Sequence, residues 1–236
     1  MTRNEPEQSN KKDLTSKAYM AIRQMLFYNE ILPGQKIKYH DLANRIGVSI
    51  TPVIQALKWL EFRNIVRHEA NKGYYINEVS VKEVREIYNT RLLLEVSLVP
   101  DIILRLDEAG IISLEKSFAT YQKAFVEDNY YNRMMTDMQF HLNLASLAQC
   151  TIQIMMLQEL FDMLLLRYSR NLFFLSVTDT SLTEHKRILA AVSKTNQEEL
   201  CAAVTDHIVG VRNHIIKGME RLVVDRKETM SDLFSY

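Results

Sequence analysis

Long apolar stripes at helical spacing constrain the fold of this chain more than any other feature. They run through most of the 236 residues, and only six glycines and four prolines are available to interrupt them. Apolar positions three or four residues apart are typical of a helix that packs one face on a core. The sequence therefore predicts a mainly α-helical protein, whose apolar residues (47%) suffice for the cores of one or two domains.

Charge, cysteine content and hydrophobicity indicate where in the cell the protein works more clearly than what it does. Residues 1–78 carry twelve basic against eight acidic side chains in a chain of zero formal net charge, which neither requires nor excludes nucleic acid. Two cysteines, Cys150 and Cys201, fit a reduced, cytoplasmic protein. We expect no signal peptide, because the N-terminus is polar, and no membrane span, because charged residues interrupt the most hydrophobic stretch, 152–175.

The first 78 residues predict a winged helix-turn-helix domain behind a disordered tail. Residues 1–12 are polar and aperiodic, as in many disordered tails. The elements expected after it are helices over Thr15–Phe27, Tyr39–Ile46 and about Pro52–Phe62, then short strands over Ile65–His68 and Tyr74–Ile76. Gly47 permits the tight turn before the third helix. This order is typical of a winged helix-turn-helix, which we place at residues 13–78; a small helical domain that binds no DNA is the alternative.

Several short motifs in this segment share one signature. They are Leu32-Pro33-Gly34, Asp41-Leu42-Ala43, the run Gly47-Val48-Ser49-Ile50-Thr51-Pro52-Val53-Ile54-Gln55-Ala56-Leu57, and Gly73 before Tyr74. Together they resemble the DNA-binding domain of GntR-family transcription regulators. The resemblance implies that the third helix reads double-stranded DNA, and that each subunit of a homodimer binds one half of a palindromic operator.

The third helix departs from the family pattern where DNA contacts are expected. Ile50 and Ile54 stand at positions where the family usually has arginines, and Gln55 replaces a glutamate. Isoleucine cannot neutralise a phosphate or pair with guanine, but it can pack on thymine methyl groups, and glutamine can pair with adenine. We therefore expect an unusual operator and a weak salt dependence. The predicted DNA contacts are His40, Ser49, Ile50, Thr51, Ile54, Gln55, Lys58 and Lys72.

Residues 79–226 predict a second, all-helical domain, followed by a tail over 227–236. Ser80 and Glu83 form a capping box at its start, and Ser181 and Glu184 form a second one. The expected helices are Val81 to about Val99, ended by Pro100, then Ile111–Phe125, Tyr130–Ala148, Ile152 to about Asn171, one opened by the second capping box, and Glu198 to about Val223. We expect them to form an antiparallel bundle of six or seven helices.

Five ionisable side chains fall in the apolar stripes of these helices. Asp137 and His141 lie one helical turn apart, and His185, His207 and His214 occupy inward positions on two later helices. A lone inward histidine is usually a hydrogen-bonded structural residue, but burial of several with a carboxylate needs a metal ion, an ion pair or a hydrogen-bond network. Three imidazoles and a carboxylate suit a divalent transition metal, zinc first, with nickel, manganese or iron as alternatives. His214 is about 10 Å along the helix from His207 and is expected to be structural or to support a ligand.

The spacing of these residues also resembles a known domain. The matching segments are Asp137-x-x-x-His141, Glu184-His185-x-x-Ile188-Leu189-x-Ala191-Val192 and Ala203 to His207. They resemble the all-helical FCD effector domain of the FadR-like branch of the GntR family. The resemblance implies that Asp137, His141, His185 and His207 bind the metal, and that a small organic acid completes its coordination.

An acidic effector needs basic partners near the metal. Arg91 is the first candidate, since it lies on the inner stripe of its helix, although an internal ion pair with Glu95, one turn away, explains it equally well. Arg133 and Arg167 are weaker candidates.

The sequence thus favours a ligand-responsive, DNA-binding transcription regulator and not an enzyme. One alternative is a metal-dependent enzyme acting on small carboxylates, since a metal with open positions can activate water. We find no general base beside the ligands, because Glu184 is interpreted as a helix cap. A further alternative is a regulator whose winged domain contacts protein in place of DNA.

Overall fold

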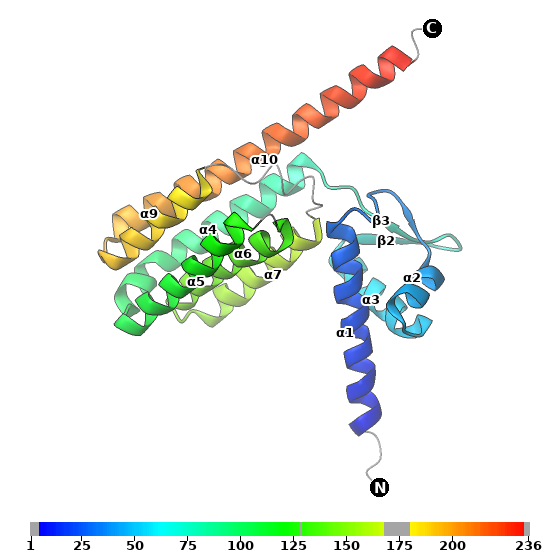
Figure 1. The fold of residues 1–236 in the computed structure, drawn as a ribbon, viewed down its shortest axis with the longest axis horizontal. Helices are drawn as coiled ribbons and strands as arrows, with labels where there is room; N and C mark the ends of the chain where they lie inside the picture. The colour runs from blue at the N-terminus through cyan, green and yellow to red at the C-terminus, as the bar shows by residue number, and fades with distance from the viewer. Residues whose placement is uncertain (1–4, 128, 168–179, 234–236) are drawn as a thin grey trace. The chain divides into compact units, whose positions relative to one another are not determined.

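The computed structural model describes residues 5–127, 129–167 and 180–233, and the side chains of 13–127, 129–166 and 180–221. The chain divides into two compact units: the first extends to Val79 and also includes Leu165 and Leu166, and the second begins at Ser80. Both units are mainly helical in the described residues, as the apolar stripes predict (Figure 1).

The first unit is a winged helix-turn-helix. Its elements are α1 (Glu5–Phe27), β1 (Lys36–Ile37), α2 (Tyr39–Ile46), α3 (Ile50–Phe62), β2 (Val66–Glu69) and β3 (Gly73–Ile76). The strands form an antiparallel sheet in the order β1-β3-β2. Gly47 ends α2 in the left-handed region, with φ 71°, which turns the chain sharply into α3. The inner stripes of the three helices supply the core of the unit, including Ile22, Leu42, Val53 and Leu57.

Two features of this unit differ from the sequence prediction. α1 begins at Glu5, well before Thr15, so most of the predicted disordered tail is helical. Residues 5–12 have no apolar stripe but consist largely of glutamate, glutamine and lysine, which are good helix formers that extend a helix already anchored by its buried part. β1, which is too short to show a period of two, is absent from the prediction.

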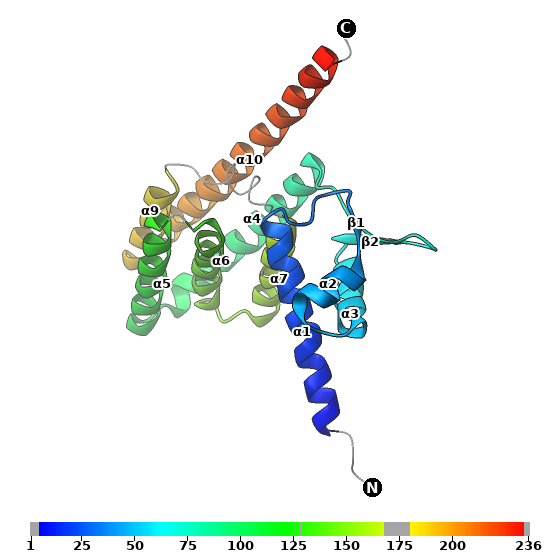
Figure 2. The ribbon, with the colours of Figure 1, turned by 45° about the vertical axis from the view of Figure 1, so that its right-hand side comes forward.

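The second unit is a helical bundle. Its described helices are α4 (Val81–Arg105), α5 (Glu108–Val126), α6 (Tyr130–Ser146), α7 (Thr151–Arg167), α9 (Ser181–Ser193) and α10 (Gln197–Leu233). α10 lies along α4 and also packs on α9 (Figure 1). α5 packs on α6 and on α9 (Figure 2), and α4 contacts α6. These contacts bring α4, α6, α9 and α10 together around one interior.

The helix ends correct two predictions and confirm a third. α4 continues through Pro100, since the burial of Leu98, Val99 and Ile102 on both sides of the exposed proline outweighs the missing hydrogen bond. α10 continues to Leu233, past the predicted end at Val223. The Ser80 hydroxyl does cap α4 by accepting from the Glu83 N–H at 3.1 Å.

Two predictions for this unit are wrong: the second capping box, and the inward position of His214. α9 is preceded by Thr180 at its cap position, and Ser181 is its first residue. His214 is exposed. The buried positions of α10 recur every four residues, at Val211, Ile215 and Met219, and His214 lies on a different face of the helix.

Candidate metal centre and nucleic-acid interface

The structure brings together the four residues that the sequence selects as metal ligands. Asp137 and His141 extend from α6, His185 from α9 and His207 from α10. One candidate ligand atom from each lies within 4.8 Å of the others. The three imidazole side chains are at most 2% exposed, and Asp137 is half-buried. Helices distant in sequence therefore converge on one small polar site in an apolar interior.

All three imidazoles turn Nδ1 outward to an oxygen atom. Nδ1 of His141 lies 2.7 Å from Oε2 of Glu95, and Nδ1 of His207 lies 2.8 Å from Oε2 of Glu184. Nδ1 of His185 lies 2.7 Å from the carbonyl oxygen of Ser181, one turn earlier on α9. Because a carbonyl oxygen only accepts, His185 must carry its proton on Nδ1.

The two carboxylates impose the same protonation on the other imidazoles. Burial alone would favour the neutral acid, but Arg91 and His141 lower the pKa of Glu95 to about 2. Burial likewise opposes ionisation of Glu184, yet its hydrogen bonds from His207 and Thr180 lower its pKa. Both groups are ionised at neutral pH and can only accept a hydrogen bond. His141 and His207 therefore donate from Nδ1.

This arrangement leaves the Nε2 atoms of all three rings facing the interior, and those of His141 and His207 unprotonated. Burial lowers the pKa of His141, and burial together with the neighbouring His185 lowers the pKa of His207 to about 4, so neither ring carries a second proton at neutral pH. Nε2 of His141 lies 3.2 Å from Nε2 of His207. Nε2 of His185 is buried without a hydrogen-bond partner among the described residues. Lone pairs that face one another at this distance repel, and a cation between them removes the repulsion.

Asp137 completes the ligand set with a negative charge. Its Oδ1 lies 3.1 Å from Nε2 of His185. Burial would raise its pKa, but His185, His141 and Arg91 hold that pKa well below the ordinary range of aspartate. The site therefore offers one carboxylate oxygen and three imidazole nitrogens as candidate ligand atoms.

The spacing of the ligand atoms fits a divalent transition metal. With metal–nitrogen distances of about 2.0–2.1 Å, two adjacent ligand nitrogens are about 3.3 Å apart in a tetrahedral site and about 2.9 Å apart in an octahedral one. The 3.2 Å between the Nε2 atoms of His141 and His207 lies within this range. The other candidate ligand atoms lie within 4.8 Å of one another, so a bound metal would draw some of them closer together.

For Arg91 the sequence left two alternatives open, an ion pair with Glu95 and a contact with an acidic effector, and the structure is compatible with both. Its side chain is buried, and its Nε donates to Oε1 of Glu95 at 2.5 Å. Burial would lower its pKa, but Glu95 raises it above the ordinary value, so the group stays charged. Its guanidinium lies 4.8 Å from the ring centroid of Phe161, and Nη2 has no hydrogen-bond partner within the described part of the chain. One donor of a buried cation thus remains for an anion.

The other two predicted basic partners differ from Arg91. Arg133 is half-buried and stacks over Phe125, with its guanidinium carbon 3.6 Å from the ring centroid. Its Nε has no hydrogen-bond partner in residues 13–127, 129–166 and 180–221. The side chain of Arg167 lies outside the described residues.

Sequence reasoning missed the groups that orient the imidazoles. It assigned Glu184 to a cap, Glu95 only to Arg91, and the carbonyl of Ser181 to no role. The structure thus adds a second carboxylate, Glu95, beside the ligands. Glu95 and Glu184 nevertheless contact the outer nitrogens of the rings, away from the enclosed Nε2 atoms, so neither is placed to deprotonate a water bound between the ligands.

The predicted DNA contacts gather on α3 and its neighbours in the first unit. Thr51, Gln55 and Lys58 are exposed on α3 and Ile54 is half-exposed beside them, whereas Ile50 packs partly against the core. The other predicted contacts are the exposed residues Ser49, before α3, His40, on α2, and Lys72, between β2 and β3.

Two of these side chains already have partners within the unit. Oε1 of Gln55 accepts a hydrogen bond from the hydroxyl of the buried Thr15 at 2.8 Å. A two-point contact with adenine uses the same oxygen, whose second lone pair would then have to accept from the base. Nζ of Lys72 lies 3.4 Å from Oε2 of Glu69, in an exposed ion pair that is weak in water.

A winged helix-turn-helix joined to an all-helical domain with a buried polar site defines a DNA-binding transcription regulator with an effector domain. Residues 14–76 match the family of bacterial regulatory proteins named gntR, and residues 86–210 match the FCD domain. The chain therefore belongs to the GntR family, in the group that carries an FCD effector domain.

Known relatives agree with this assignment. The HTH-type transcriptional regulator YdhC of Bacillus subtilis is 28% identical over 215 residues, covering 89% of this chain and 92% of YdhC. The Nta operon transcriptional regulator of Aminobacter aminovorans is 26% identical over 176 residues, covering 75% of this chain and 82% of that protein. These relatives are transcription regulators, so the chain is a regulator and the enzyme alternative is not supported.

Solved structures share the fold. The structure of McbR/YncC from Escherichia coli has a TM-score of 0.71 at 20% identity, with 86% of this chain and 97% of that chain covered. A GntR regulator from Rhodococcus sp. RHA1 has a TM-score of 0.70 at 17% identity, with the same coverage. Across the described residues, every helix is too short or too polar to cross a membrane.

Proposed function

We propose that this regulator binds a divalent transition metal in its helical domain and senses a small organic acid there. Asp137, His141, His185 and His207 would hold the metal, with zinc the first candidate. The observation that supports this most strongly is the set of three buried imidazoles whose Nδ1 atoms are all engaged, which leaves their Nε2 atoms facing the same small interior site.

The bound metal would supply a Lewis-acidic centre with open positions for a carboxylate oxygen. The chain supplies a second contact for the same acid, because Arg91 is a buried cation with an unpartnered Nη2 donor. Arg91 is joined to a candidate ligand through Glu95, whose other oxygen lies 2.7 Å from Nδ1 of His141. Arg133 is a further candidate through its unpartnered Nε.

DNA binding would use the exposed side of α3 in a cytoplasmic homodimer, with one half of a palindromic operator per subunit. Thr51 and Lys58 are exposed for phosphate or base contacts, and Ile54 offers an apolar surface for thymine methyl groups. The acid would act by binding more tightly to one of two arrangements of the DNA-binding domains.

Elemental analysis of the purified protein, combined with thermal-shift measurements, tests the metal site and the effector together. We expect about one equivalent of metal per chain and a further rise in melting temperature with some members of a panel of organic acids. The variants His141→Ala and His185→Ala should lose the metal. The control is His214→Ala, which removes an exposed histidine from the same domain.

Retention of wild-type metal content by both ligand variants would show that the site is assigned wrongly. DNA binding is tested by titrating the protein against the promoter of its own operon at several salt concentrations, with and without the acid. Absence of a footprint under all of these conditions would contradict operator binding, whatever the metal content.

A further inference from the structure

Glu184 links the candidate metal centre to the first turn of α9. Its Oε2 accepts from Nδ1 of His207 on α10 at 2.8 Å, and its Oε1 accepts from the hydroxyl of Thr180 at 2.7 Å. The side chain is 29% exposed, compared with 2% for His207. One carboxylate thus holds a buried ring with one oxygen and the helix start with the other.

The contact with Glu184 decides which nitrogen of His207 carries the proton. A neutral imidazole has one N–H, and an ionised carboxylate at Nδ1 keeps it there. Without this acceptor, the proton can move to Nε2, which lies 3.2 Å from the unprotonated Nε2 of His141. The two rings would then form an N–H···N hydrogen bond with each other and close the site to a metal.

The other two imidazoles are oriented by groups that are harder to test. Glu95 holds His141 but also neutralises the buried Arg91, so its removal disturbs folding as well. His185 is held by the backbone carbonyl of Ser181, which no side-chain substitution removes. Glu184 is the position at which orientation of a ligand can be separated from stability.

We propose that Glu184 is a positioning residue that keeps His207 in the tautomer required for metal binding and couples metal occupancy to the N-terminal turn of α9. This inference rests on the proposed metal function. Groups that hydrogen-bond the outer nitrogen of a metal-ligating histidine typically change metal affinity by 10–100-fold.

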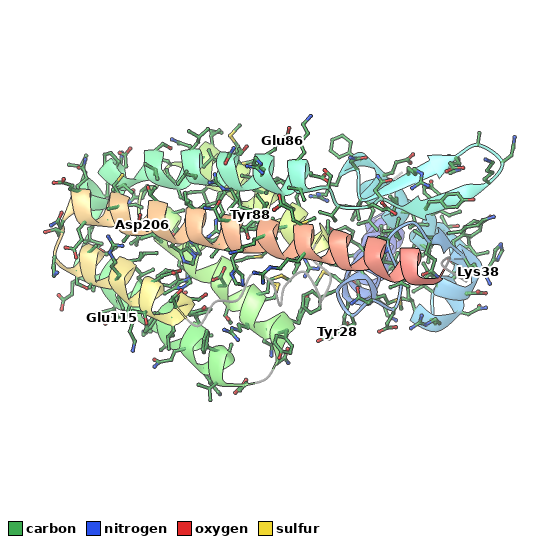
Figure 3. All side chains as sticks on the ribbon, turned by 90° about the horizontal axis from the view of Figure 1, so that it is seen from above. Tyr28, Lys38, Glu86, Tyr88, Glu115 and Asp206 are labelled. Carbon is green, nitrogen blue, oxygen red and sulfur yellow. The ribbon has the colours of Figure 1, made fainter. Side chains whose placement is uncertain are left out.

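The experiment compares Glu184→Ala, Glu184→Gln and the control Glu115→Gln in the full-length protein. Glu115 lies at the outer side of α5, exposed and remote from the ligands in sequence (Figure 3). Zinc affinity is measured by competition with a chelating dye. We expect Glu184→Ala to weaken zinc binding 10–100-fold, Glu184→Gln to weaken it less because its amide oxygen still accepts from Nδ1, and the control to match wild type.

A second measurement reports the tautomer directly. Nitrogen-15 NMR of the metal-free protein should show His207 protonated at Nδ1 in wild type and shifted toward Nε2 in Glu184→Ala. Thermal unfolding of the metal-free variants should stay close to wild type, which separates positioning from folding. Hydrogen exchange of the amides in the first turn of α9 should slow on zinc binding in wild type and respond less in Glu184→Ala.

The outcomes separate this inference from the proposed function. Wild-type protein that binds no zinc refutes the metal function and the inference with it. Wild-type protein that binds zinc, together with Glu184→Ala that binds it equally tightly, refutes only the positioning role. The positioning role is also refuted if Glu184→Gln and Glu184→Ala lose the same amount of zinc affinity while His207 keeps the wild-type tautomer in both variants. The loss of the negative charge alone would then explain the weaker zinc binding.

Discussion

Removal of one partner from the Arg91–Glu95 pair should destabilise the helical unit strongly. The side chains are 2% and 3% exposed, so Glu95→Gln leaves a charged guanidinium in an apolar interior without its counter-ion. Breaking a buried pair in this way typically costs about 3–5 kcal/mol. That is a large share of the roughly 5–15 kcal/mol that stabilises a typical domain. The glutamine keeps an oxygen acceptor for only one of its two partners, Arg91 and His141, so the expected loss combines the unpaired charge with one hydrogen bond.

The assay is urea unfolding of chelator-treated protein. The single tryptophan, Trp59, lies in the first unit, so its fluorescence follows that unit, while circular dichroism follows mainly the helical bundle. Glu95→Gln should lower the stability seen by circular dichroism and leave the fluorescence transition in place. Glu86→Gln, which removes a charge from the exposed Lys82–Glu86 pair, should change stability by less than about 0.5 kcal/mol.

The double variant Arg91→Met with Glu95→Gln decides whether the unpaired charge is the cause. With both charges gone, the loss should be much smaller than in Glu95→Gln alone. A loss below about 1 kcal/mol in the single variant, or a double variant as unstable as the single one, would refute the reasoning.

Three further predictions follow from other parts of the molecule. The stability of the metal-free protein should fall as the pH drops from about 6.5 to 4. The pKa of His207 is about 4 in the folded chain and about 6.5 for a histidine exposed to water, so the unfolded state binds the extra proton first. Thermal melts across this range should show the fall in stability, and His207→Gln should make it smaller. Ile54→Arg should steepen the salt dependence of operator binding by about one unit of slope, since one more phosphate is neutralised; an unchanged slope in a salt titration would place Ile54 away from the DNA backbone. Gly47→Ala should cost about 1–2 kcal/mol, since φ is 71° there and the space around the added methyl group is open; equal unfolding midpoints for the two proteins would contradict the strain argument.

The sequence determined which helix faces are apolar and which ionisable residues fall on them. A period of 3.6 residues is a local property, so Asp137 and His141 share a face whatever surrounds their helix. The same reasoning places His185 and His207 inward, and the structure agrees. It fails for His214, because the direction of a buried stripe over several turns depends on the helix packed against it.

Only the tertiary structure decided what each ionisable group contacts. The pairs Glu95 with His141 and Glu184 with His207 join residues 46 and 23 positions apart, on helices that meet through packing. No local pattern encodes such a pair, and the local pattern at Glu184 suggested a cap. Periodicity therefore found the ligands of the candidate metal centre, because facing inward is a property of one helix, whereas their orientation required the packing of four helices.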